Sequence, residues 1–378
     1  MRYLKINIEN DLNKKAILLS GARQVGKSTF AKSLMTKKSL YLNWDISKHR
    51  TIIRNISWDK DHDLVVLDEL HKMPKWKNYL KGIIDEYCNR PRLLITGSAR
   101  LDIFRKSGDA LTGRQYLYHL HPIDVTEAKT FTPKLNAYDR MMRLLAYGGF
   151  PEAYLNPADA DRLRNDRFDL IIREDLRDLS KVNSITAIQN LIDILRDRGC
   201  GTLSYSSLAE DLHVSAPTVK EWINLLQKLC LIFVIHPYTG SLSRSLKKEA
   251  KFYFYDCAAT YEKGDGGICF ENLVASTLIK FCDYKKDTEG KKFELRYFKD
   301  KEKREVDFVV TLNNRPYWLI ECKTSDDNLS PSLNYLNQKL KSNNAFQLVR
   351  DISKNKEISG IKIVNAANWL DNIMSYHE

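Results

Sequence analysis

The sequence predicts an α/β protein in which a parallel sheet is followed by a winged helix and then by a second α/β domain. Three observations indicate this order. Short apolar runs alternate with helical segments between residues 16 and 96, as in parallel sheets covered by helices. Two short helices followed by two strands lie between residues 203 and 255. Two adjacent strands that carry acidic residues lie between residues 304 and 323.

The first element is a strand, a glycine-rich loop and a helix. Ala16–Leu19 predicts the strand, and Thr29–Met35 predicts the helix. Between them lies the pattern G-x-x-x-x-G-K-[ST] of a phosphate-binding loop, formed by Gly21, Ala22, Arg23, Gln24, Val25, Gly26, Lys27 and Ser28. Backbone N–H groups of such a loop bind the β-phosphate of a nucleotide. We expect Lys27 to contact the β- and γ-phosphates of ATP, Ser28 to hold Mg²⁺, and Thr29 to join the nucleotide site.

A second buried strand ends in two carboxylates. The apolar run Leu64–Leu67 precedes Asp68 and Glu69, which is the Walker B pattern. Asp68 is placed to reach Mg²⁺, and Glu69 is placed to polarise the attacking water, so it is a catalytic candidate. Tyr41–Asp45 predicts the strand between the two motifs, and the run at residues 92–95 predicts a further strand that ends in Thr96-Gly97-Ser98. This last tripeptide is either an ordinary β-turn or a contact to the reacting phosphate.

Two later motifs, Leu111-Thr-Gly-Arg114 and Tyr147-Gly-Gly-Phe-Pro-Glu152, complete a series. Together the motifs resemble prokaryotic AAA-like ATPases fused to a C-terminal domain of unknown function, over nearly the whole chain. The resemblance implies a P-loop NTPase sheet in which Thr96 or Ser98 contacts the γ-phosphate or the attacking water. It also implies that Arg114 is an arginine finger. The alternative for Arg114 is a loop cap or a partner of a carboxylate, and action in trans would require a homo-oligomer.

The middle of the chain has a helix-turn-helix pattern. Five apolar residues fall at core spacing across two short helices: Leu208, Leu212, Val219, Ile223 and Leu226. Ser215 is a natural N-cap for the second helix. The strands at residues 231–235 and 252–255 complete a winged helix, and four basic residues lie in or beside the wing: Arg244, Lys247, Lys248 and Lys251. The second helix exposes Thr218, Lys220, Asn224 and Gln227, which predicts DNA as a partner. The alternative is a winged helix used for domain packing or protein contact.

The last third of the chain carries a second chemical pattern. Side chains two apart share one face of a strand, so Glu321 and Lys323 point together, and a hairpin partner brings Asp307 alongside. The resulting D-x13-E-x-K pattern resembles the PD-(D/E)xK nuclease core, a restriction-endonuclease-like fold. The resemblance implies that Asp307 and Glu321 bind Mg²⁺, that Lys323 activates water or steadies charge, and that Glu271 on the preceding helix joins the metal site. The alternative is a domain that keeps this fold without cleaving anything.

Composition narrows the class of protein. The chain has 378 residues, of which 43% are hydrophobic and 29% charged, with a net charge of +12. A basic surplus favours a polyanionic partner, and general surface solubility is the alternative. No apolar run approaches the ~20 residues of a membrane span, and the N-terminus lacks a signal-peptide pattern. The seven cysteines are scattered singly, so we expect a cytoplasmic protein with no membrane contact, no disulfide framework and no zinc site.

We expect four domains from these patterns. They are an AAA-like P-loop ATPase domain (1–155), a helical connector or lid (156–182), a winged helix (183–256) and a PD-(D/E)xK nuclease-like domain (257–378). The predicted function is an ATPase that couples Mg-ATP to DNA binding or processing. Two alternatives stay open: a nucleotide-dependent regulatory or scaffold protein with a non-catalytic C-terminal domain, and a DNA-binding regulator with slow ATP turnover.

Overall fold

The computed structural model of the chain describes residues 2–87, 90–97, 111–176, 185–239, 249–263, 266–342 and 344–375. The chain divides into two compact units: Met1–His121 with Lys228–Cys230, and Pro122–Gln227 with Leu231–Glu378. The division into four domains stays a prediction. Residues 122–155 were expected in the first domain, and they group with the second unit. Apolar side chains of this segment, among them Val125, Met141 and Tyr154, belong to the core of the second unit.

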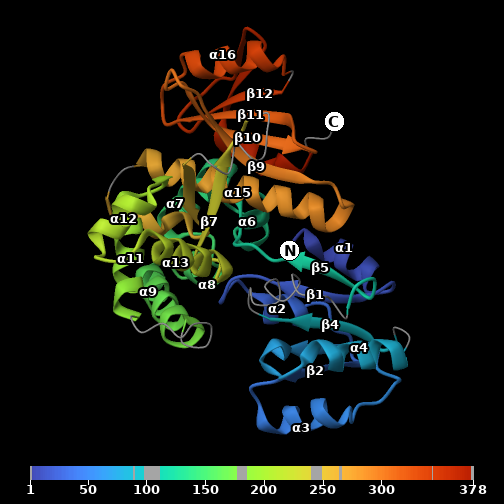
Figure 1. Cartoon of the computed structure of the whole chain (residues 1–378). Helices are drawn as coiled ribbons and strands as arrows, with labels where there is room; N and C mark the ends of the chain where they lie inside the picture. The colour runs from blue at the N-terminus through green and yellow to red at the C-terminus, as the bar shows by residue number, and fades with distance from the viewer. Residues whose placement is uncertain are drawn as a thin grey trace. The chain divides into compact units, whose positions relative to one another are not determined.

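In the first unit, the described residues form a parallel five-stranded sheet in the order β2-β3-β4-β1-β5 (Figure 1). The strands are β1 (Ala16–Ser20), β2 (Ser39–Asn43), β3 (Leu64–Asp68), β4 (Arg92–Thr96) and β5 (Gln115–His119). Around them lie α1 (Leu4–Asp11), α2 (Lys27–Lys32), α3 (Ser47–Asn55), the turn η1 (Leu70–Lys72) and α4 (Trp76–Tyr87). Both β1 and β3 are buried along their whole length, as central strands of a helix-covered sheet are. The predicted parallel α/β sheet is therefore confirmed.

The helix after the phosphate loop differs from the prediction in its bounds. It begins at Lys27 instead of Thr29 and ends at Lys32 instead of Met35. Gly26 has a φ of 95°, which lets the chain turn from the loop directly into the helix. The Phe30 N–H then donates to the Gly26 carbonyl at 2.8 Å. As a result, Lys27 and Ser28 both lie in the first helical turn.

The second unit begins with helices. These are α6 (Val125–Phe131), α7 (Ala137–Tyr147), α8 (Pro151–Leu155), the turn η3 (Pro157–Asp159), α9 (Ala160–Leu170), the π-helix η4 (Ile171–Leu176) and α11 (Ile185–Arg198). Asp124 and Asn136 start α6 and α7 by accepting hydrogen bonds from backbone N–H groups of the first turn. The connector expected over residues 156–182 is helical as far as residue 176, and residues 177–184 lie outside the described part of the chain.

A pair of short helices and three strands follow. They are β6 (Gly201–Leu203), α12 (Tyr205–Asp211), α13 (Ala216–Lys228), β7 (Ile232–Pro237) and β8 (Ala250–Phe254). The strand β8 pairs antiparallel with both β6 and β7. Of the expected core positions, Leu208, Val219, Ile223 and Leu226 are buried, while Leu212 is half-buried. Ser215 Oγ accepts a hydrogen bond from the Thr218 N–H at 3.3 Å, as expected of an N-cap.

The rest of the second unit continues the same sheet. Its elements are the turn η5 (Cys257–Lys263), α15 (Gly266–Glu289), β9 (Phe293–Lys299), β10 (Glu305–Leu312), β11 (Arg315–Lys323), α16 (Pro331–Leu340), β12 (Ala345–Val349), β13 (Lys356–Ile358), β14 (Ile361–Asn365), α17 (Ala366–Asp371) and the turn η6 (Ile373–Ser375). Within the described residues, the sheet runs β13-β14-β12-β11-β10-β9-β7-β8-β6. Because β7 pairs in parallel with β9, the middle and the C-terminal parts of the chain share one sheet.

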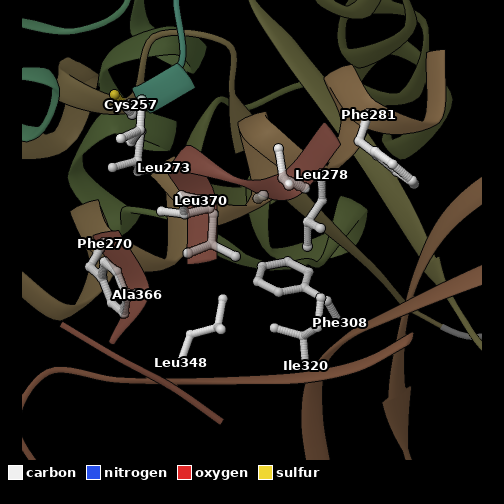
Figure 2. Close-up of a cluster of buried hydrophobic side chains, with 14 of the residues drawn as sticks. Cys257, Phe270, Leu273, Leu278, Phe281, Phe308, Ile320, Leu348, Ala366 and Leu370 are labelled. Carbon is white, nitrogen blue, oxygen red and sulfur yellow. The ribbon is translucent and has the colours of Figure 1, made fainter. Parts of the chain in front are cut away.

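Neighbouring residues of β10 and β11 pack into two different hydrophobic cores. Phe308 and Ile320 face the larger core, where they lie with Phe270, Leu273 and other residues of α15 (Figure 2). Their neighbours Val309 and Leu319 belong to a smaller core with Leu333 and Leu336 of α16. This alternation places α15 and α16 on opposite faces of the hairpin. No helix in the described part of the chain is long and apolar enough to span a membrane.

Candidate functional site

The phosphate loop passes close to neighbouring backbone at Gly21. An added Cβ at Gly21 would lie 2.4 Å from the carbonyl oxygen of Leu120, so this position cannot hold a side chain without a shift. Ala22 and Val25 are buried and anchor the loop, whereas Gln24 and Thr29 are exposed and Arg23 is half-buried. An exposed loop with a buried anchor is free to present backbone N–H groups to a phosphate.

The amine of Lys27 lies inside the loop. Its Nζ donates to the carbonyl oxygens of Gly21 at 3.0 Å and Ala22 at 2.7 Å. Burial lowers the pKa of Lys27, because Glu69 and Asp68 only partly offset the loss of hydration. The side chain is 7% exposed, so its charge is held close to the position where the loop would bind a phosphate.

Asp68 joins the ends of three neighbouring strands to the phosphate loop. Its carboxylate accepts hydrogen bonds from Ser28 Oγ at 2.7 Å, from the hydroxyls of Thr96 and Tyr41, and weakly from Asn43 Nδ2 at 3.4 Å. Asp68 is only 1% exposed. A hydroxyl beside a carboxylate is a set of hard oxygen ligands suited to Mg²⁺, so Ser28 and Asp68 fit the ion that the sequence predicts.

Glu69 follows Asp68 in the chain, but its carboxylate has different neighbours. Its backbone is in the left-handed region with a φ of 58°. Its carboxylate lies 3.5 Å from Lys72 Nζ, and Lys72 also pairs with Asp45 at 2.6 Å. Burial raises the pKa of Glu69 above its ordinary value, against the opposing charges of Lys72 and Lys27.

Arg114 pairs with a carboxylate of its own unit. Its Nε lies 2.6 Å from Asp85 on α4, and the guanidinium side chain is 37% exposed. The hydrogen bond to Arg114 lowers the pKa of Asp85. This contact matches the alternative of a carboxylate partner, and an arginine finger stays a prediction. Ser98, the alternative to Thr96, lies outside the described residues.

In the second unit, the β10–β11 hairpin brings the predicted nuclease residues to adjacent strands. Asp307 Oδ2 accepts a hydrogen bond from the backbone N–H of Cys322 at 2.8 Å. Lys323 Nζ lies 2.9 Å from Glu321 Oε1, which also accepts from Ser330 Oγ at 3.3 Å. Glu321 is 6% exposed, and its Oε2 has no hydrogen-bond partner among the described residues. A buried carboxylate oxygen in that state fits a cation ligand.

Several carboxylates near this hairpin shift one another's pKa. Burial raises the pKa of Asp307 well above its ordinary value, and the charges of Glu271 and Glu321 raise it further. The pKa of Lys323 is raised despite burial, because Glu321 and Asp307 favour its charged form. Asp307, Glu321 and Lys323 thus interact with one another, as the D-x13-E-x-K pattern predicts.

Glu271 is held by other groups. It accepts a hydrogen bond from the Tyr253 hydroxyl at 2.6 Å and lies 3.5 Å from Lys251 Nζ. Within the described residues, no group of three or more His, Cys, Asp or Glu side chains is placed to hold a metal ion. Tyr253 and Lys251 bind Glu271, so Asp307 and Glu321 are the pair of carboxylates that fits a cation, and the metal role of Glu271 stays a prediction.

The residues predicted to contact DNA are only partly described. Lys220 and Asn224 of α13 are exposed, and Thr218 and Gln227 are half-buried. Arg244, Lys247 and Lys248 lie outside the described residues. Lys251, predicted to lie in or beside the wing, has a side chain that is 7% exposed and pairs with Glu305 at 2.5 Å, so it is not available to contact a phosphate.

The sequence patterns did not predict the contacts that Tyr41, Lys251 and Ser330 make at these sites. Tyr41 lies on β2 and reaches Asp68 on β3, since residues 41 and 66 are register partners of these paired strands. A polar residue on a strand next to the Walker B strand was the available signal. For Lys251 and Ser330 the sequence held none, because their partners lie elsewhere in the chain.

Three family models match successive parts of the chain. Residues 13–129 match a model described as AAA domain. Residues 138–261 and 266–369 match two models, each described as a domain of unknown function (DUF8612 and DUF4143). The boundary between the latter two falls between the turn η5 and the helix α15.

Three uncharacterized proteins are similar to most of the chain at low identity. Uncharacterized proteins of Mycobacterium tuberculosis and Mycobacterium bovis are each 22% identical over 335 residues, which covers 84% of this chain and 72% of theirs. An uncharacterized protein of Methanocaldococcus jannaschii is 25% identical over 366 residues, covering 80% of this chain and 74% of its own.

Two solved structures are similar at lower identity. A Walker-type ATPase of Pyrococcus abyssi matches at a TM-score of 0.42 and 15% identity, covering 68% of this chain and 93% of that one. A signal transduction ATPase with numerous domains from Pyrococcus horikoshii, which carries a tetratricopeptide repeat sensor, matches at a TM-score of 0.32 and 14% identity, covering 77% and 47%.

Proposed function

We propose that this protein, whose residues 13–129 match an AAA domain, binds and hydrolyses ATP with Mg²⁺ and couples this cycle to DNA binding or processing by its second unit. The first half of the proposal rests on one observation above all. Asp68 at the end of β3 accepts a hydrogen bond from Ser28 of the phosphate loop at 2.7 Å. Two motifs separated in sequence thereby meet at the edge of the sheet where nucleotides bind in such folds.

Each residue of the nucleotide site then has a distinct task. The backbone of Gly21–Ser28 binds the phosphates, and Lys27 exchanges the carbonyls of Gly21 and Ala22 for phosphate oxygens. Ser28 and Asp68 would hold Mg²⁺, which when bound neutralises the charge on the phosphates. Glu69 accepts a proton from the attacking water, a step that requires its carboxylate to be ionised.

The second half of the proposal rests on the second unit. The order of α12, α13, β7 and β8 is that expected of a winged helix, with Lys220 and Asn224 exposed on α13. Asp307, Glu321 and Lys323 lie on the paired strands β10 and β11, after α15 and before α16, as expected of a PD-(D/E)xK core. The net charge of +12 is consistent with a polyanionic partner.

At the hairpin, this chain's residues would support hydrolysis of a phosphodiester. Asp307 and Glu321 would hold Mg²⁺ or Mn²⁺, which when bound polarises the phosphate and lowers the pKa of water. Lys323, 2.9 Å from Glu321, would orient that water or stabilise the developing negative charge.

A second function is favoured by the surroundings of Glu271. Lys251 and Tyr253 bind its carboxylate, so the third acidic residue of the pattern is engaged within the protein. In this reading, the protein is a nucleotide-dependent regulator or scaffold, and the C-terminal domain binds a partner without cleaving DNA.

Two measurements on the full-length protein separate these functions. Electrophoretic mobility of duplex DNA is compared with no nucleotide and with ATP plus Mg²⁺. Retarded DNA whose amount changes with ATP supports the coupled function, and no retardation in either condition favours the scaffold. Nicking of supercoiled plasmid with Mg²⁺ or Mn²⁺ then tests processing, with Asp307→Asn as the matched inactive variant.

A further inference from the structure

Lys251 is a buried cation that lies among carboxylates from two other elements. Its Nζ lies 2.5 Å from Glu305 of β10 and 3.5 Å from Glu271 of α15. The amine also lies 5.4 Å from the centre of the Tyr297 ring on β9. Only 6% of the residue is exposed, so its charge is balanced by protein groups and hardly by water.

The charge of Lys251 also acts on the predicted metal ligand. Burial disfavours the ammonium, but the charges of Glu271, Asp307 and Glu305 outweigh burial and raise the pKa of Lys251. Lys251 in turn opposes the rise in the pKa of Asp307. The ion pairs with Glu305 and Glu271 hold the amine beside β10, where Glu305 lies two residues from Asp307.

A divalent ion at Asp307 and Glu321 would feel this ammonium as a repulsive charge. Like charges in a buried site repel more strongly than they do in water. Glu321 Oε2 has no hydrogen-bond partner among the described residues, so the site retains an acceptor for a cation. The same acidic cluster thus has a resident positive charge and room for another ligand bond.

We propose that Lys251 is the resident cation of the acidic residues Glu271, Glu305, Asp307 and Glu321, and that a divalent cation binds to Asp307 and Glu321 tightly only when the Lys251 ammonium withdraws. The inference rests on the metal site of the proposed function. The contacts of Lys251 also connect two parts of the chain. Lys251 lies in the segment matched at residues 138–261, whereas the four carboxylates lie in the segment matched at residues 266–369. Metal binding by the second segment would depend on β8 of the first.

The test is Mn²⁺ binding to the full-length protein without nucleotide, measured by isothermal titration calorimetry. Lys251→Met removes the charge and keeps most of the apolar stem. We expect it to bind Mn²⁺ about tenfold or more tightly than the wild type does. Thermal unfolding gives a second readout, in which Mn²⁺ raises the Tm of Lys251→Met more than that of the wild type.

Three further variants test whether the gain in Mn²⁺ affinity comes from the charge of Lys251 next to Asp307. Lys285→Met removes another largely buried lysine, which pairs with Glu289 on α15 at 2.5 Å, and should leave Mn²⁺ affinity at the wild-type value. The double variant Lys251→Met/Asp307→Asn should lose the gained affinity, because a proposed ligand is gone. Lys251→Gln, which is uncharged but can still donate a hydrogen bond to Glu305, is measured in the same way in case Lys251→Met does not fold.

Equal Mn²⁺ affinity in the wild type and both Lys251 variants would overturn the inference. So would a gain that survives Asp307→Asn. The proposed function fails separately: if Lys251→Met binds Mn²⁺ tightly but nicks no plasmid, the inference stands and the nuclease function falls. If the wild type nicks plasmid while the Lys251 variants gain no affinity, the nuclease function stands and the inference falls.

Discussion

Two adjacent carboxylates at the end of β3 have different surroundings, and this difference assigns their tasks. Asp68 accepts hydrogen bonds from the hydroxyls of Ser28, Thr96 and Tyr41, which fix its position. Glu69 has no such hydroxyl set in the described interactions and is instead paired with Lys72 at 3.5 Å. A fixed acid suits a metal ligand, and an acid whose charge is tuned by a neighbour suits a base.

Replacing Glu69 with Gln should separate nucleotide binding from turnover. The substitution keeps the shape of the side chain but removes the proton acceptor, so we expect kcat for ATP to fall about a hundredfold or more with little change in affinity. A fluorescent ATP analogue measures binding and phosphate release measures turnover. Lys27→Ala is the companion variant, and it should lose binding itself. Unchanged turnover in Glu69→Gln would remove this residue from the reaction.

The pair with Lys72 predicts the pH dependence of ATP hydrolysis. Burial raises the pKa of Glu69 and the charge of Lys72 lowers it, so Lys72→Met should raise this pKa further. Because Glu69 must be ionised to act, activity falls as the pH drops through its pKa. The acidic limb of the kcat–pH profile should therefore move to higher pH in Lys72→Met. A limb that stays in place, or moves to lower pH, would contradict this role for Lys72.

At the scale of elements, the β1–loop–α2 unit depends on the close approach of Gly21 to β5. Gly21→Ala would place a Cβ 2.4 Å from the carbonyl oxygen of Leu120, which directly follows β5 at the end of the sheet. We expect a loss of about 1–3 kcal/mol in the free energy of unfolding together with weaker ATP binding. Urea denaturation and nucleotide titration measure the two effects.

A matched control lies in α4. Gly82 is in the middle of that helix, and an added Cβ there would meet nothing within 4 Å. Gly82→Ala should therefore raise stability by about 1 kcal/mol, since alanine favours the helix. If both glycine variants lose stability equally, the crowding at Leu120 is not the cause.

The elements that could be predicted from the sequence are those defined by contiguous residues. The strand before the phosphate loop, the Walker B strand and the β10–β11 hairpin each have a local apolar pattern ending in polar residues, and all three are present. The start of α2 was predicted too late, because the left-handed Gly26 begins the helix inside the motif. Lys251 was grouped with the basic residues of the predicted wing because its partners, Glu271 and Glu305, become neighbours only through folding.

At the scale of the whole molecule, the two proposed sites belong to separate compact units. Asp307→Ala or Lys323→Ala should abolish any plasmid nicking, because one removes a metal ligand and the other removes the group that orients water. Basal ATP hydrolysis should stay at the wild-type rate, since neither residue lies in the unit with the phosphate loop. Both activities are measured on the same preparations.

Ser276→Ala is a suitable control for these two variants, because among the described residues its hydroxyl donates to the Leu273 carbonyl within α15. It should retain both activities. Nicking that persists in Asp307→Ala would assign the cleavage to a contaminating nuclease or to other residues. A parallel loss of ATP hydrolysis would show that the substitution disturbs more than the hairpin.

The boundary between the two compact units could not be predicted from the sequence, for a physical reason. Residues 122–155 follow the P-loop motifs without a break in composition, so the sequence offers no signal of a boundary at His121. What places them in the second unit is the burial of their apolar side chains against distant residues, as with Met141 and Tyr154. Such long-range packing has no period in the sequence that would reveal it.

The parallel pairing of β7 with β9 has a consequence for dissecting this protein. A fragment cut at the family boundary, between residues 261 and 266, would keep β9 but lose its neighbour β7. One side of β9 would then present unpaired backbone N–H and C=O groups as an open sheet edge. Such an edge recruits strands from other molecules, so the isolated C-terminal fragment should self-associate or precipitate. A cut close to residue 121 would keep β9 paired with β7 in the second unit.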